Sequence, residues 1–152
     1  MAYVTAEAQQ NLLAEVARAI DAIGVALAAL GTAYELLDET TADRLEAELF
    51  RPVQIAYGRA KRTHDSFAER HGLAVGSFPP ATPPAPSHGV KPLIEDAVGD
   101  VAAADETLSE LQDSLLPVEV GDQELRAGLA EVRELLGEVR GRARTFTRTL
   151  GR

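Results

Sequence analysis

The sequence predicts an all-α protein, an antiparallel four-helix bundle made of two similar helical hairpins joined by a long Pro-rich linker. Four segments repeat apolar residues at alternating steps of three and four, the spacing of a helix that packs along its neighbours. Ala and Leu, which favour helix, supply most of the apolar residues, and strand-like runs are few. A single Pro-rich stretch divides the chain into two parts.

The first helix is expected to follow Thr5, a residue type that caps helix N-termini. Beside its apolar stripe, Ala17, Gly24 and Gly31 repeat every seven residues. Such small residues let a neighbouring segment approach the helix closely. The stripe itself consists of Leu13, Val16, Ile20, Ile23, Leu27, Leu30, Tyr34 and Leu37.

The second helix is expected to start at a cap formed by Thr40 or Thr41 and to end at Gly72, which suits the left-handed residue after a helix. Pro52 lies inside its apolar pattern. A proline within a helix removes one hydrogen bond and clashes with the preceding turn, so we expect a kink between Glu48 and Pro52.

The segment over 73–90 holds five of the eight prolines and is therefore expected to be extended, close to polyproline II. It is longer than a tight turn between neighbouring helices requires. The linker is thus expected either to pass over one end of the bundle or to cross to a diagonal helix. The predicted organisation is one domain over 1–152, with hairpins over 5–72 and 91–151.

The third and fourth helices repeat the pattern of the first two, which suggests an internal duplication. At offsets of 78 and 79 residues, apolar positions of the first hairpin fall on apolar positions of the second. The alternative is two unrelated hairpins with the same helical period. The more distinctive matches are Val53 with Val132, Gly58 with Gly137, Phe67 with Phe146, and Gly72 with Gly151.

Composition excludes several kinds of function. The chain has no cysteine, so disulfides and cysteine nucleophiles are excluded. A net charge of −9 argues against nucleic-acid binding by the whole surface. No Glu-x-x-His pair occurs, so we expect no metal or other cofactor. No apolar run approaches the roughly 20 residues of a membrane span, and the N-terminus does not resemble a signal peptide, so we expect a soluble cytoplasmic protein.

Basic residues concentrate near the ends of the second and fourth helices. In an up-down-up-down bundle these ends coincide, which predicts a basic end opposite an acidic one. Cations at helix C-termini complement the helix dipole, and this is one interpretation. The other is a site for an acidic partner, a phosphate-bearing ligand or RNA. The candidate residues for that site are Arg140, Arg142, Arg144, Arg62 and Arg148.

Asp105 interrupts the apolar stripe of the third helix. A buried carboxylate without a partner is unfavourable, so we expect an arginine or tyrosine opposite it, an outward turn, or a polar site. A polar residue that fixes the register of the helices is a further interpretation.

One short element bears on catalysis. The segment from Arg59 to His64 resembles the Arg-x(4–6)-His element of HEPN ribonucleases, which are helical bundles that cleave RNA as dimers. The resemblance implies that Arg59 contacts the scissile phosphate and that His64 takes part in acid–base chemistry. It covers six residues, and Ala60 stands where that family commonly has a polar residue.

The hypothesis that follows is a non-enzymatic helical-bundle protein that acts through protein–protein interaction or self-association, with a protein partner or a homodimer. A HEPN-like ribonuclease or toxin is the first alternative. A surface-coating amphipathic protein similar to phasins is the second, although apolar stripes this regular favour a closed core.

Overall fold

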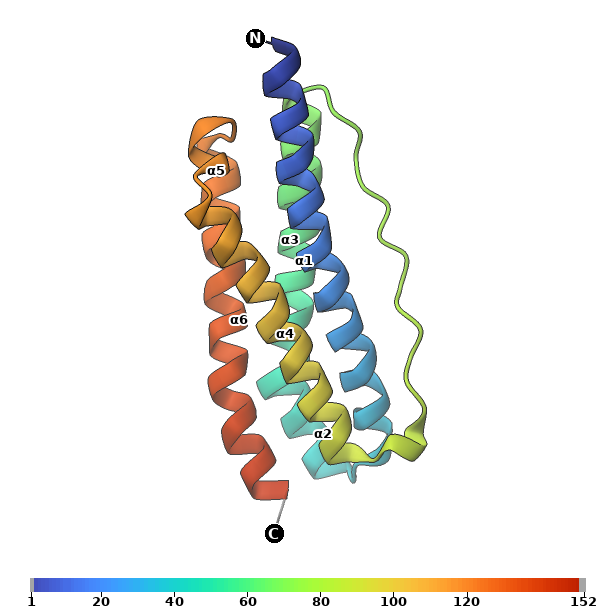
Figure 1. Ribbon diagram of the computed structural model, residues 1–152. Coiled ribbons are helices and arrows are strands. Elements are labelled where there is room, and N and C mark those ends of the chain that lie inside the picture. The colour runs from blue at the N-terminus through green and yellow to red at the C-terminus, as the bar shows by residue number, and fades with distance from the viewer. Residues whose placement is uncertain (1, 151–152) are drawn as a thin grey trace.

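The computed structural model describes residues 2–150, and it is all-helical with no strand in that range. This confirms the all-α prediction and is compatible with the four-helix bundle. Four long helices lie side by side (Figure 1). They are α1 (Ala2–Leu36), α3 (Arg51–Arg70), α4 (Val90–Asp113) and α6 (Gln123–Leu150). The shorter elements are α2 (Glu39–Leu45), the π-helical turn η1 (Glu46–Phe50), the 3-10 turn η2 (Pro86–His88) and α5 (Leu116–Glu119).

The linker, predicted over 73–90, connects the end of α3 at Arg70 with the start of α4 at Val90, and it decides the topology. It leaves the end of α3 and runs along the outside of the molecule to the opposite end, where α4 begins (Figure 1). Therefore α3 and α4 point the same way. Helix α1 packs against α3 and α4, and α6 packs against the same two, so α3 and α4 occupy diagonal positions. The linker takes the diagonal crossing, which was one of the two expected paths.

This path makes the prediction of one basic and one acidic end wrong. Helix α3 ends where α6 begins, and α6 ends where α4 begins (Figure 1). At the first of these ends, Arg70 of α3 lies against Asp122, directly before α6. At the other end, Arg44 of α2 hydrogen-bonds Thr149 of α6. The two groups of arginines thus lie at opposite ends of the molecule, each with acidic neighbours.

The apolar stripes pack into one core, in which Phe67 and Phe146 are fully buried. These two aromatics are a matched pair of the suggested duplication, whereas Gly151 lies outside the described residues. Leu115 lies between two helices, because α4 ends at Asp113 and α5 begins at Leu116. It has a left-handed φ of 67° and is 54% exposed.

The helix boundaries correct two predicted caps. Helix α1 already begins at Ala2, so Thr5 does not cap it. The cap of α2 is Asp38, whose side chain accepts a hydrogen bond of 2.8 Å from the backbone N–H of Thr41. The predicted role of Gly72 holds: it has a φ of 69°, and the next N–H, of Leu73, donates to the Ala68 carbonyl at 2.7 Å.

Pro52 is accommodated by the π-helical turn before it rather than by an end of the helix. The Arg51 N–H donates to the carbonyl of Glu46, five residues earlier. The longer π turn widens the backbone just where the proline supplies no N–H and its ring needs room. The chain therefore stays helical from Glu39 to Arg70, and its irregular turn, Glu46–Phe50, overlaps the segment from Glu48 to Pro52 in which a kink was expected.

Candidate functional site

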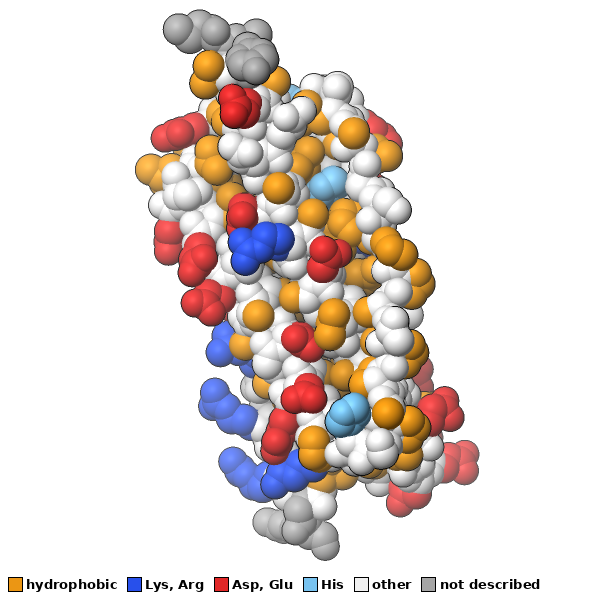
Figure 2. Space-filling view, turned by 45° about the vertical axis from the view of Figure 1, so that its right-hand side comes forward, with side chains coloured by type: hydrophobic (Ala, Val, Ile, Leu, Met, Phe, Trp, Pro, Cys, Tyr) orange, Lys and Arg blue, Asp and Glu red, His pale blue; other side chains and the backbone are white. Residues whose placement is uncertain are grey.

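A basic groove lies between α4 and α6, near the end where α4 begins and α6 ends. Its volume is about 620 Å³. In Figure 2, most Lys and Arg side chains gather toward the lower left of the molecule, and Asp and Glu side chains lie beside them and over the rest of the face shown. Helix α4 contributes Lys91, Glu95, Val98, Gly99 and Ala102, and α6 contributes Arg140, Ala143, Arg144, Thr147 and Arg148.

Helical spacing aligns these side chains. The three arginines of α6 follow one another every four residues, as do Lys91, Glu95 and Gly99 of α4, so each set forms a row on one face. The floor between the rows consists of small residues. A Cβ atom built on Gly99 would have no atom within 4 Å, which shows that the floor is open there. The groove therefore has three arginines along its α6 edge, Lys91 and Glu95 along its α4 edge, and small residues along its floor.

The groove carries four cationic side chains and a single carboxylate, Glu95. Within the part of the chain that the structure describes, Lys91, Arg144 and Arg148 form no ion pair. All three are exposed. Because no carboxylate of residues 2–150 neutralises these three side chains, their positive charge is available to a ligand.

Asp105 joins α4 to α6 at the inner end of this groove. Its carboxylate, 14% exposed, accepts a hydrogen bond of 2.8 Å from Arg133 Nε, and Arg140 Nη1 lies 3.4 Å from its other oxygen. Arg133 also donates to Gln112 at 2.7 Å. The polar residue of the third stripe thus has an arginine opposite it, and the same carboxylate orients one arginine of the groove.

The other two predicted arginines lie elsewhere. Arg142 does not line the groove and pairs with Glu138 on its own helix, at 3.7 Å. Arg62 belongs to α3 and lines a separate hollow between α3 and α6, together with Glu131, Glu134 and other residues. The predicted set therefore divides into three arginines that share the groove and two that do not.

Sequence reasoning missed Lys91 and Glu95, although a signal for them was present. An antiparallel hairpin formed by the third and fourth helices places the start of one beside the end of the other. Lys91 at the start of α4 therefore had to lie close to Arg144 and Arg148.

The six-residue element from Arg59 to His64 does not converge on one site. Arg59 pairs with Glu131 of α6. His64 is buried, with 5% of its surface exposed, and its Nδ1 lies 2.8 Å from Asp65 Oδ1. The ring of Phe78, from the linker, packs against it edge to face at 5.2 Å. The two side chains thus contact different elements.

Comparison with protein-family models, with curated proteins and with solved structures gives no match to this chain. Among residues 2–150, no helix has both the length and the hydropathy needed to cross a membrane. Within the same range, no three His, Asp or Glu side chains lie close enough together to hold one metal ion.

Proposed function

We propose that this protein is a non-enzymatic, cytoplasmic four-helix bundle with one diagonal crossover, and that it binds an acidic protein partner in the basic groove. The observation that carries the proposal is the combination of unpaired cations on the edges with a floor of small residues. Charged edges steer an oppositely charged partner and fix its register, while an apolar floor supplies burial.

The shape of the groove favours an amphipathic helix as the docking segment. From Lys91 to Ala102 the groove follows α4 over eleven helical steps, roughly 16 Å at 1.5 Å per step. That length matches about three turns of a partner helix, whose small or apolar face would lie on Gly99 and Ala143. Its acidic residues would meet Arg144 and Arg148.

The buried position of His64 and its separation from Arg59 lend no support to the ribonuclease alternative. The packed core likewise favours binding through polar surfaces over a surface-coating role, which needs an apolar face free to spread. The ribonuclease alternative is tested separately, by comparing RNA cleavage by the wild type and by His64→Ala. Equal activity of the two proteins would remove it.

The groove is tested with a fluorescently labelled, helical peptide made of Glu, Ala and Leu, and with the same peptide carrying Lys in place of Glu. We expect the acidic peptide alone to bind. Reversing the two outer charges with Arg144→Glu and Arg148→Glu should weaken binding at least tenfold, and added salt should weaken it as well.

Arg142→Glu and Arg62→Glu are the matched controls, since each makes the same charge change outside the groove. The proposal fails if these controls lose as much affinity as the groove variants. Because the chain itself carries a net charge of −9, a second copy is also an acidic partner. Sedimentation of the wild type and of the Arg144→Glu, Arg148→Glu variant distinguishes a homodimer through the groove from a different partner.

A further inference from the structure

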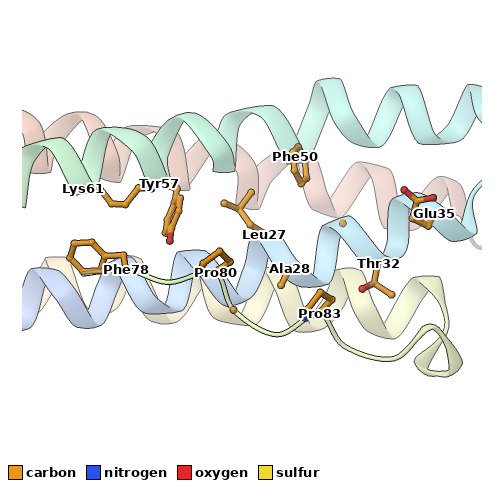
Figure 3. A pocket seen from close by; sticks show the side chains of 13 residues that line it. Leu27, Ala28, Thr32, Glu35, Phe50, Tyr57, Lys61, Phe78, Pro80 and Pro83 are labelled. Atoms are coloured by element: carbon orange, nitrogen blue, oxygen red, sulfur yellow. The ribbon is translucent and has the colours of Figure 1, made fainter. Parts of the chain in front are cut away.

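A second cavity, of about 510 Å³, lies under the linker between α1 and α3. The linker forms its outer wall with Pro80, Ala81 and Pro83 (Figure 3). Leu27 and Ala28 of α1 lie beneath, and Phe50 and Tyr57 close the side toward α3. We call this cavity the linker pocket. Its volume falls within the range of small-molecule sites, roughly 300–1,000 Å³.

The linker is held over this pocket from both ends. Near one end, the N–H of Gly76 donates to Asp65 Oδ1 at 2.9 Å, and Phe78 packs on His64. Near the other, the Thr32 hydroxyl donates to the Pro84 carbonyl at 3.0 Å. The prolines between these points have no N–H with which to bond to the helices. The linker therefore spans the space between its anchors instead of filling it.

Helix α1, which lies beneath the linker, also leaves open space along the linker pocket. A Cβ atom built on Gly24 would lie 3.3 Å from the ring of Tyr57. The tyrosine therefore closes this end of the pocket. A Cβ atom built on Gly31, one heptad further along, would have no atom within 4 Å. The open part of the pocket thus extends along α1 from Tyr57 toward Gly31.

The two ends of the pocket differ in charge. Figure 3 shows Lys61 and Tyr57 at one end and Glu35 at the other. The Lys61 ammonium lies 4.1 Å from the centre of the Tyr57 ring and forms no ion pair with another described residue. Burial, with a smaller contribution from Asp21, raises the pKa of Tyr57, so its hydroxyl keeps its proton as a donor at neutral pH.

We propose that the linker pocket binds a single-chain carboxylic acid, with the carboxylate at Lys61 and the Tyr57 hydroxyl and the alkyl chain along Leu27, Phe50 and the linker prolines. Lys61 supplies the charge that an acid requires. Glu35 repels an acid at the far end and so fixes the direction of the ligand. The lining residues of α1 run from Gly24 to Glu35, roughly 16 Å at 1.5 Å per residue, which is long enough for one extended alkyl chain.

The test uses calorimetric titration of the full chain with dodecanoate below its micelle-forming concentration, and with dodecylammonium as the ligand of opposite charge. We expect one dodecanoate per chain and at least tenfold weaker binding of the amine. Lys61→Gln should remove this preference while leaving the packed core untouched. Equal binding of the two ligands to the wild type, or no binding of dodecanoate, would overturn the proposal.

The location is tested by filling the pocket. Gly31→Leu places a side chain in the open space and should weaken dodecanoate binding at least tenfold. Gly137→Leu is the matched control, because its Cβ also has open space around it but lies on α6, away from the pocket. An equal effect of both variants would place the ligand elsewhere. Phosphatidylcholine vesicles free of fatty acid should not bind, and binding to them would point to a membrane surface instead.

Discussion

Arg70 and Asp122 form a two-pronged ion pair: Arg70 Nε and Nη2 donate to the two carboxylate oxygens of Asp122, each at 2.8 Å. The same carboxylate accepts the backbone N–H of Leu125 at 2.8 Å and so caps α6. His71 Nε2 lies 2.9 Å from it. One side chain thereby ties the end of α3 to the start of α6 and fixes their antiparallel alignment.

Replacing this carboxylate with an amide should destabilise the fold. Asp122→Asn keeps a capping oxygen but loses the charge that pairs with Arg70, and we expect a loss of about 1–2 kcal/mol at pH 7. Asp122→Ala removes the cap as well and should lose about 1 kcal/mol more. Urea unfolding measures both, and an Ala variant no less stable than the Asn variant would contradict the capping role.

The same pair predicts how stability depends on pH. Hydrogen bonds from Arg70, then the Leu125 N–H and His71, hold the pKa of Asp122 well below its usual range. In the unfolded chain the pKa is about 3.9, so the unfolded state binds more protons below that value and stability falls as the pH falls. The stability difference between wild type and Asp122→Asn should therefore narrow between pH 7 and pH 3. A constant difference would contradict this assignment.

Helices α3 and α6 are in close contact at Gly128. A Cβ atom there would lie 2.7 Å from Cγ2 of Thr63 and closer still to its hydroxyl. Gly128→Ala should therefore cost about 1–3 kcal/mol, although alanine favours helix. Combining it with Thr63→Ala should recover most of the loss. Gly137→Ala, where nothing lies within 4 Å, is the control and should stabilise the protein by up to about 1 kcal/mol.

Replacing Leu115 with asparagine should increase the free energy of unfolding. It adopts a left-handed backbone conformation at φ 67°, and its side chain is 54% exposed. Asn tolerates this conformation better than leucine does, so Leu115→Asn should stabilise the fold by about 0.5–1 kcal/mol in urea unfolding. Leu116→Asn, at the neighbouring position that packs against the core, should destabilise it. A loss of stability in Leu115→Asn would show that the leucine contributes packing.

Asp105 and Arg133 should be energetically coupled. Asp105→Ala leaves Arg133 without its carboxylate partner and should cost about 1–3 kcal/mol. In a double-mutant cycle with Arg133→Leu the double variant should lose less than the sum of the single losses. Glu106→Ala, an exposed residue of the same helix, is the control and should change stability little. Additive losses would mean that the two side chains are not coupled.

The sequence predicted the helices well, because the apolar spacing that indicates a helix involves only residues three or four positions apart. The caps were harder, since Asp38, Thr40 and Thr41 are all capping types and only backbone geometry selects Asp38. The direction of the linker could not be predicted at all: its prolines specify an extended chain but not where that chain leads. Arg62 was grouped with the arginines of α6 for this reason alone. The prediction was correct for three arginines of α6, because residues four apart on one helix lie close together whatever the topology. They are Arg140, Arg144 and Arg148.

The linker is the only covalent connection between the pair α1–α3 and the pair α4–α6, yet α1 packs along α4 and α3 packs along α6. Separately produced fragments, divided near Thr82, should therefore find each other and assemble into the same core without a continuous backbone. Such a two-piece protein would keep the basic groove intact, since both its walls belong to the second fragment. The cut would divide the outer wall of the linker pocket into two pieces, each held at a single anchor. A single cut would therefore weaken binding in the linker pocket while leaving binding in the basic groove unchanged.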